Sequence, residues 1–173
     1  MLKDFNLLIS TSRGNEENTC SEAWHLLSVI GDTPAAIDKT GVTGLITARA
    51  NLDPLEVIKK FREILKESPW EFRYTLRVIP IERIVHTNLE EIQNAATDLA
   101  SKIRQNETFR VTVEKRFTAF STTEIIEAAA TNIDRKVELE NPDKIVLIEI
   151  IRELTGISVM KPVDILSVVK ERT

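Results

Sequence analysis

Cysteine, histidine, glycine and proline are all scarce in this chain of 173 residues. The single cysteine, Cys20, excludes an internal disulfide and a thiolate metal cluster, and such usage is typical of a reducing compartment. The two histidines, His25 and His86, stand in no metal-ligand spacing. Five glycines and six prolines argue against long flexible linkers. We therefore expect no metal site and no cofactor.

Long apolar runs and an excess of positive charge are also missing. The longest apolar run, residues 145–151, is interrupted by Glu149 and is far shorter than the roughly 20 residues of a spanning helix. The N-terminus has no signal-peptide pattern, so we expect a cytoplasmic protein without a membrane segment. The net charge of −4 argues against a strongly basic nucleic-acid binder. Any RNA site must therefore be a local patch.

The first half of the chain predicts the order β-α-β-β-α-β. A strand at 5–10 is followed by a helix at 16–30, with Gly31 as its C-terminal cap, and by two short strands at 35–38 and 45–48. Asp53, Pro54 and Glu56 begin a second helix, and a long strand candidate at 72–84 breaks at Pro80. This order is the ferredoxin-like arrangement. We place its end near residue 86.

The second half predicts a further α/β domain. Asn88 with Glu91 and Ser121 with Glu124 have the spacing of helix caps. The second of these helices is expected to turn a set of apolar residues inward: Ile125, Ile126, Ala129 and Ile133. Strands are expected at 109–113, 144–151 and 156–160, whereas 162–169 is ambiguous between strand and helix. The predicted fold class is α+β, with domains at 1–86 and 87–173.

No catalytic motif stands out from the sequence. Cys20 and His25 are five residues apart on one helix, which places them on different faces. Gly41 and Gly44 form a G-x-x-G, the loop with which KH domains hold RNA backbone, but between two strands a hairpin turn is the favoured interpretation. The acidic pairs at helix starts suit the helix dipole better than an acid–base dyad.

One cluster of positive charge departs from the acidic background. Residues 102–116 contain five cations and two acids, and Phe117 and Phe120 follow directly. Cations beside exposed aromatic rings hold phosphates and stack on bases. The alternative is a solvated strand edge whose aromatic side chains lie in the core. The sequence leaves both interpretations open.

Three segments together resemble the THUMP domain, an RNA-binding module of tRNA- and rRNA-modification proteins. They are residues 108–116 (TFRVTVEKR), 121–126 (STTEII) and 137–143 (VELENPD), and the last is the most specific. Residues 145–151 and 155–159 fit the closing strands of that module. Upstream, 78–82 and 87–92 resemble the junction from a ferredoxin-like domain, and 44–46 with 53–57 resemble the Tan branch of the family.

The resemblance implies a tRNA-binding adapter rather than an enzyme. Members of the Tan branch serve an RNA cytidine acetyltransferase that forms acetylcytidine in tRNA, and the chain leaves no room for a catalytic domain before Thr173. The acceptor end of tRNA is the expected ligand, and a prokaryotic, archaeal source is expected. The RNA-binding residues carried over from the matched motif or placed by charge are Arg110, Lys115, Arg116, Lys136 and Lys161.

Two other functions compete with the adapter interpretation. Residues 87–173 hold 12 Lys and Arg against 15 Asp and Glu, a net of −3, which suits a protein-interaction module without RNA binding. Ferredoxin-like domains also host small hydrolases such as acylphosphatases. That activity would need a phosphate site at the first strand–helix loop, where Arg13 and Asn15 stand with a single glycine, Gly14.

Overall fold

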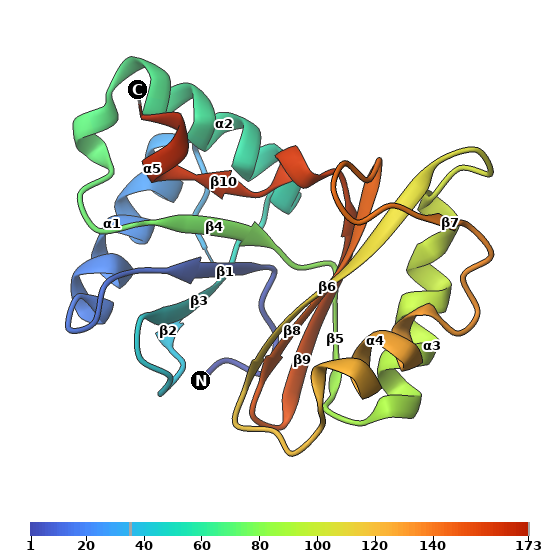
Figure 1. The fold of residues 1–173 in the computed structure, drawn as a ribbon. Coiled ribbons are helices and arrows are strands. Elements are labelled where there is room, and N and C mark those ends of the chain that lie inside the picture. The colour runs from blue at the N-terminus through green and yellow to red at the C-terminus, as the bar shows by residue number, and fades with distance from the viewer. Residues whose placement is uncertain (35, 173) are drawn as a thin grey trace. The chain divides into compact units, whose positions relative to one another are not determined.

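The computed structural model describes residues 1–34 and 36–172 and divides the chain into two compact units. Unit 1 comprises Met1–Ile81 together with the segment that starts at Val163, and unit 2 comprises Glu82–Pro162. Each unit has its own five-stranded sheet and helices, so the chain is α+β, as predicted (Figure 1). The described residues include no helix long and apolar enough to cross a membrane.

Unit 1 has an antiparallel sheet in the order β10-β4-β1-β3-β2. Its elements are β1 (Leu7–Ser10), α1 (Glu16–Val29), β2 (Ala36–Lys39), β3 (Leu45–Arg49), α2 (Pro54–Glu67), a 3₁₀ turn (Pro69–Glu71), β4 (Arg77–Pro80), β10 (Leu166–Ser167) and α5 (Val168–Glu171). The first six major elements follow the predicted order β-α-β-β-α-β. The ferredoxin-like arrangement is therefore confirmed.

The helices of unit 1 bury their apolar stripes against the sheet. Leu26 of α1 and Phe61 of α2 join Ile9 of β1 and Ile46 of β3 in one buried cluster. The carboxylate of Asp53 accepts from the amide of Leu55, so the predicted cap of α2 is present. Of the predicted strand at 35–38, Ala35 lies outside the described residues.

The strand candidate at 72–84 is confirmed in its break at Pro80 and wrong at its start. Residues 72–76 form a loop, β4 ends at Pro80, and β5 (Arg83–His86) pairs with a strand of the other sheet. Pro80 has no amide hydrogen with which to continue a ladder. The compact units thus differ from the predicted spans of 1–86 and 87–173, because β5 belongs to unit 2 and β10 to unit 1.

Unit 2 has a mixed sheet in the order β5-β9-β8-β6-β7. Its elements after β5 are α3 (Leu89–Leu99), a 3₁₀ turn (Ala100–Lys102), β6 (Thr108–Arg116), α4 (Thr122–Ala130), β7 (Lys136–Val137), β8 (Lys144–Ile151) and β9 (Leu154–Met160). Strand β6 runs parallel to β7 and β8, with α4 in the crossover, and the remaining pairs are antiparallel. The predicted central strand at 144–151 is confirmed.

Helices α3 and α4 cover one face of the sheet in unit 2 (Figure 1). Ile92 of α3 and Ile125 of α4 share a buried cluster with Phe109 and Ile148. The capping box of Ser121 and Glu124 is complete. Ile126 was expected to point inward but is 37% exposed, because the residue after Ile125 is rotated by about 100° around the helix.

Candidate nucleic-acid interface

Strand β6 distributes the predicted RNA-binding cations between the two faces of its sheet. Side chains alternate along a strand, and Val111 and Val113 pack toward the helix-covered core. Lys115 shares their side, whereas Arg110 and Arg116 point to the opposite side. These two arginines are six positions apart, which corresponds to roughly 20 Å along a strand. The structure therefore does not bring Arg110, Lys115 and Arg116 into one patch.

Arg110, Lys136 and Lys161 lie at the end of the sheet where β6 begins. The guanidinium of Arg110 donates to the carbonyl of Leu139 at 2.7 Å and to the hydroxyl of Thr112 at 3.3 Å. Lys136 is exposed and pairs with Thr108 in the β6–β7 register. Lys161 is exposed and follows β9, whose last residue, Met160, pairs with the second residue of β8.

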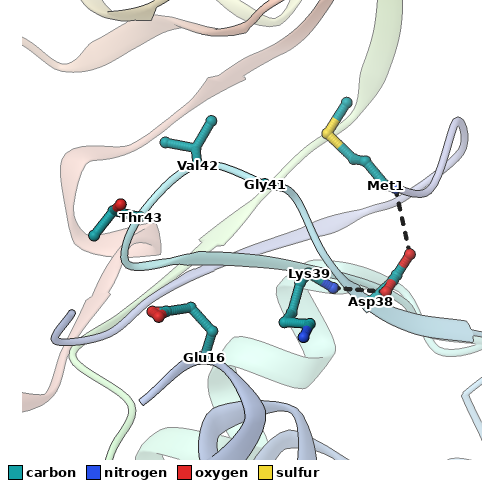
Figure 2. Close-up of a pocket in the computed structure, with 7 residues that line it drawn as sticks. All are labelled: Met1, Glu16, Asp38, Lys39, Gly41, Val42 and Thr43. Carbon is teal, nitrogen blue, oxygen red and sulfur yellow. Dashed lines mark hydrogen bonds and ion pairs between the residues drawn. The ribbon is translucent and has the colours of Figure 1, made fainter. Parts of the chain in front are cut away.

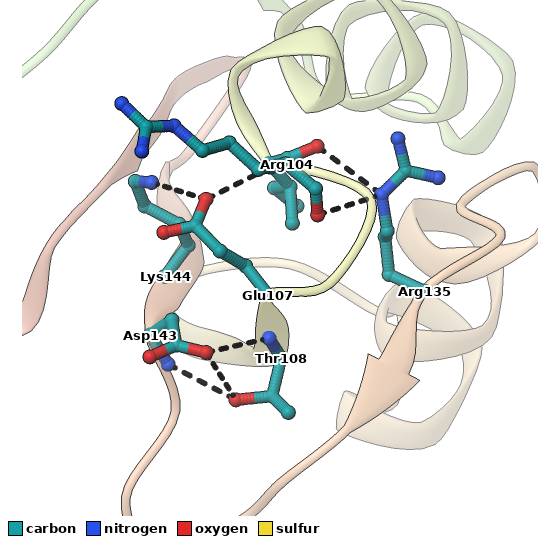
Figure 3. A network of polar contacts seen from close by, with 7 residues as sticks. Arg104, Glu107, Thr108, Arg135, Asp143 and Lys144 are labelled. Carbon is teal, nitrogen blue, oxygen red and sulfur yellow. Dashed lines mark hydrogen bonds and ion pairs between the residues drawn. The ribbon is translucent and has the colours of Figure 1, made fainter.

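The Asn-Pro-Asp turn is clamped to the first residue of β6 (Figure 3). The carboxylate of Asp143 accepts from the amide of Thr108 at 2.8 Å and from its hydroxyl at 3.1 Å. The amide of Asp143 donates to the same hydroxyl at 3.1 Å. This reciprocal contact fixes the start of β8 beside the start of β6. The most specific part of the sequence motif is thus a structural clamp.

A second set of polar contacts holds the loop before β6 (Figure 3). The ammonium of Lys144 lies 2.7 Å from the carboxylate of Glu107, which also accepts from the amide of Arg104 at 2.8 Å. The hydrogen bond from Lys144 lowers the pKa of Glu107, and that from Arg104 adds to the effect. Arg135 donates to the carbonyls of Ile103 and Arg104. Because Glu107 pairs with Lys144, the positive charge of this lysine is largely neutralised.

Lys115 and Arg116 lie at the far end of β6, in different surroundings. Lys115 is exposed, and its ammonium donates to the carbonyl of Phe120 at 3.1 Å. The guanidinium of Arg116 is 2.8 Å from the carboxylate of Glu149, and its side chain is only 22% exposed. The charge of Lys115 faces a carbonyl and adds, after the hydrogen bonds from Ser121, to the lowering of the pKa of Glu124, whereas the charge of Arg116 is paired within the sheet.

Next to Lys115, an exposed cation stacks on an exposed aromatic ring. The guanidinium of Arg152 lies 4.3 Å from the ring centroid of Phe117, which is 69% exposed. Both residues have positive φ, 59° for Phe117 and 57° for Arg152, and the amide of Arg152 donates to the carbonyl of Arg116 at 3.0 Å. Sequence reasoning missed Arg152, since only the β6–β8 register brings it beside Phe117.

The loop at which a phosphate site was considered carries a carboxylate. Both oxygens of Glu16 accept from the amide of Gly14, at 2.9 and 3.0 Å. The side-chain oxygen of Asn15 accepts from Asn18 at 3.2 Å. A carboxylate on the loop amide opposes the binding of a phosphate there. This geometry does not favour the acylphosphatase-like interpretation.

The Gly41–Gly44 segment is the turn between β2 and β3, as predicted, and borders a pocket of about 430 Å³ (Figure 2). Charges of both signs line it. The N-terminal ammonium of Met1 lies 3.4 Å from the carboxylate of Asp38, and Lys39 pairs with Glu17. Since these positive groups already have acidic partners, the pocket offers little net attraction for phosphate.

The residues considered for other chemistry have ordinary surroundings. The imidazole of His25 lies 2.8 Å from the carboxylate of Glu71 at the surface. Burial raises the pKa of the Cys20 thiol, and the negative charges of Glu17 and Asp38 raise it further, which disfavours the nucleophilic thiolate. Within residues 1–34 and 36–172, no group of three or more His, Cys, Asp or Glu side chains is placed to hold a metal ion.

Sequence comparison shows that the chain contains a THUMP domain. Residues 86–160 match the sequence model of that domain. The protein MJ0421 of Methanocaldococcus jannaschii is 25% identical over 157 residues, which cover 88% of this chain and 40% of that protein. The chain thus spans less than half the length of this curated relative.

Solved structures share the fold of both units. PH1313 from Pyrococcus horikoshii Ot3 has a TM-score of 0.72 at 18% identity, over 91% of this chain and 55% of that chain. A 4-thiouridine synthetase crystallised with RNA and ATP has a TM-score of 0.57 at 15% identity, over 95% of this chain and 42% of that chain. TrmN from Thermus thermophilus has a TM-score of 0.56 at 15% identity, over 88% of this chain and 44% of that chain. At these identities the likeness concerns the fold alone.

Proposed function

We propose that the protein binds tRNA and acts as an adapter in tRNA modification. The match of residues 86–160 to the THUMP domain is the observation that carries this proposal. The fold shared with a 4-thiouridine synthetase crystallised with RNA supports it. In the full form of the proposal, the chain presents the acceptor end of tRNA to an RNA cytidine acetyltransferase. Catalysis then belongs to that partner.

Phosphate contacts would come from cations at the two ends of β6, of which Arg110 is half-buried and the others are exposed. Lys115 and Arg152 serve one end, and Arg110, Lys136 and Lys161 serve the other. Phe117 adds a ring on which a base can stack. Arg116, paired with Glu149, would act mainly by holding the end of the strand. Cations roughly 20 Å apart suit contacts to a folded RNA backbone better than the reading of single bases.

The acidic balance of residues 87–173 supports a role for a partner. With a net charge of −3, this region attracts RNA only through local contacts. A basic partner enzyme would supply the remaining affinity. The same balance favours the second candidate, a protein-interaction module that binds the enzyme but not tRNA.

Filter binding to total tRNA at low salt tests the proposal. The variant Lys115→Glu/Lys136→Glu reverses one exposed charge at each end of β6. It should bind roughly tenfold or more weakly and should lower the salt slope by about 2, because each phosphate-contacting lysine contributes about one unit. Lys59→Glu/Lys66→Glu makes the same charge change at exposed positions of α2. It is the matched control and should bind nearly as the unmodified protein does.

Addition of the acetyltransferase separates the two candidates. Under the adapter proposal, tRNA acetylation depends on this protein and declines with Lys115→Glu/Lys136→Glu. Tight binding to the enzyme without any binding to tRNA, alone or in the complex, would replace the adapter by the protein-interaction module. If Lys115→Glu/Lys136→Glu and the control Lys59→Glu/Lys66→Glu bind tRNA equally well, the ends of β6 are not the RNA site.

A further inference from the structure

Unit 1 contains an open hollow of about 560 Å³ that the proposed interface on β6 does not use. It is lined by Pro69, Trp70, Phe72, Arg73 and Arg172, and we call it the Trp70 hollow. Its size falls within the roughly 300–1,000 Å³ of small-ligand sites. An indole that is 68% exposed and two exposed guanidinium groups surround it. Large exposed aromatic side chains mark interaction sites when they adjoin convergent polar groups.

Both arginines of the Trp70 hollow keep their positive charge. The guanidinium of Arg73 lies 5.5 Å from the ring centroid of Tyr74, a contact with a neutral group. The guanidinium of Arg172 donates to the carbonyl of Phe72, which is also neutral. Of the two acids next to these segments, Glu171 forms an ion pair with Arg62, and Glu71 contacts His25, whose imidazole is charged only when it is protonated. The hollow is therefore suited to an anion.

The loop that carries Arg73 is held in place by a buried carboxylate. Glu22 of α1 is 8% exposed and accepts from the amides of Arg73 at 2.7 Å, Tyr74 at 3.1 Å and Thr75 at 2.8 Å. The hydroxyl of Thr75 donates to it at 2.7 Å. A buried carboxylate that takes four hydrogen bonds fixes the backbone firmly. The backbone that carries Arg73 is thus preorganised, which lowers the entropic cost of binding.

The floor of the Trp70 hollow is rigid as well. Phe72 is 1% exposed and packs edge-on against Phe61 of α2, with ring centroids 6.1 Å apart. Trp70, which also lines the hollow, lies on the 3₁₀ turn Pro69–Glu71. A flat indole beside two guanidinium groups matches a ligand with an aromatic ring and a phosphate. That combination is an unpaired nucleotide.

We propose that the Trp70 hollow binds one unpaired nucleotide of RNA, with the base stacked on Trp70 and the phosphate held by Arg73 and Arg172. This inference rests on the proposed RNA-binding function and assigns unit 1 a contact of its own. A double-stranded segment would not enter, because its bases are stacked on each other. The occupant is thus a single-stranded end or loop of the bound RNA.

Tryptophan fluorescence of the full chain tests the assignment. The chain has two tryptophans, so Trp24→Phe leaves Trp70 as the only reporter. A single-stranded hexamer of adenosine should quench the emission of this variant, whereas a blunt-ended RNA duplex of two separate strands, which has no unpaired nucleotide, should not. If the hexamer does not quench the emission, the inference is wrong, and a protein ligand becomes the favoured occupant of the Trp70 hollow.

Anisotropy of a labelled adenosine hexamer then identifies the residues. Trp70→Ala should weaken binding roughly 5- to 100-fold, the range for loss of one stacked base. Because Trp70 is 68% exposed, this change leaves the core intact, and Trp24→Ala is the aromatic control. Arg73→Gln/Arg172→Gln should also weaken binding and flatten its salt dependence, in contrast to Lys59→Gln/Lys66→Gln.

The two proposals fail in different ways. If total tRNA binding is lost with Lys115→Glu/Lys136→Glu but hexamer binding is unchanged by Trp70→Ala, the Trp70 hollow is not an RNA site and the proposed function stands. If Trp70→Ala weakens hexamer binding while the charge variants on β6 leave tRNA binding unchanged, the Trp70 hollow stands and the interface on β6 fails.

Discussion

The two units secure their loops in different ways. In unit 1 the buried carboxylate of Glu22 takes the amides of residues 73–75, and Asp32, 3% exposed, takes the amides of Asn51 and Leu52. In unit 2 the corresponding contacts are less deeply buried: that between Asp143 and Thr108 is exposed, and the side chains of Lys144 and Glu107 are 13% and 20% exposed. Water competes more strongly with these contacts than with the buried ones of unit 1.

This difference bears on how each unit would bind RNA. The buried clamp of Glu22 presents a preformed hollow, in which a single nucleotide can be held by shape. The surface contacts of unit 2 leave cations such as Lys115 and Lys136 exposed at both ends of a strand, which suits phosphates at adaptable positions. We therefore expect stability to depend more on single polar residues in unit 1 than in unit 2.

The largest effect is expected for Glu22→Gln. In the variant, an NH₂ group replaces one of the two carboxylate oxygens that accept from the backbone amides of residues 73–75. Because a donor then faces donors, the free energy of unfolding should fall by about 2–3 kcal/mol. Urea unfolding followed by tryptophan fluorescence measures it, because Trp24 and Trp70 both lie in unit 1. Glu63→Gln, an exposed change on α2, should stay within about 0.5 kcal/mol. Equal midpoints for the two variants would contradict the comparison.

A slightly smaller effect is expected for Gly44→Ala, at the turn between β2 and β3. Gly44 has φ +75°, and an added Cβ would lie 2.7 Å from the carbonyl oxygen of Thr11. The left-handed backbone alone costs about 1–2 kcal/mol for alanine, and the clash adds to it, giving about 2 kcal/mol or more. Gly31→Ala separates the cost of the left-handed backbone from the cost of the clash, since Gly31 has φ +84° and open space around it. A loss as large for Gly31→Ala would show that the close approach of Thr11 is unimportant.

Local patterns made most of the fold predictable. The caps at Asp53 and at Ser121 with Glu124 are fixed by neighbouring residues, and the branched residues of 144–151 gave the central strand. The pairing of β10 with β4 was not predictable, because a strand of two residues has no periodicity and its partner is almost 90 residues away. The sequence of either segment alone does not indicate which distant segment it pairs with.

The candidate site was predictable only in its composition. Charge alone points to residues 102–116, but the two-residue period of a strand separates Lys115 from Arg110. Arg152 meets Phe117 through the parallel register of β6 and β8, in which Arg116 pairs with Ile151. The Trp70 hollow likewise depends on a contact between Phe72 and Arg172, 100 residues apart. Such sites need the tertiary fold.

In unit 2, Ser121→Ala should have a smaller effect than either change in unit 1. Its hydroxyl accepts from the amide of Glu124 at 3.1 Å at an exposed helix start, and loss of such a cap costs about 1 kcal/mol. Amide hydrogen exchange in α4 should speed up accordingly, by roughly fivefold. Thr122→Ala, one residue along, is the matched control and should leave exchange unchanged. If Ser121→Ala lowers the free energy of unfolding by more than Glu22→Gln does, the proposed ranking of the two units is reversed.

The smallest effect, and one that depends on pH, is expected at the ion pair of Lys144 and Glu107. The hydrogen bond from Lys144 lowers the pKa of Glu107 below its ordinary value of 4.5. The folded state therefore binds this proton less readily than the unfolded state, so the pair stabilises the fold above that value and loses its effect as pH falls through the lowered pKa. Lys144→Gln should lower the urea midpoint slightly at pH 7, and this difference from the unmodified protein should shrink as the pH is lowered toward 3.

Lys136→Gln is the matched control for this titration, because Lys136 is exposed on β7, which lies on the other side of β6 from β8. Its effect on the urea midpoint should be near zero at both pH values. A difference between the Lys144→Gln variant and the unmodified protein that is as large at pH 3 as at pH 7 would mean that the stem of Lys144 stabilises the loop by packing. The contacts of unit 2 would then resemble those of unit 1 more closely than their greater exposure implies.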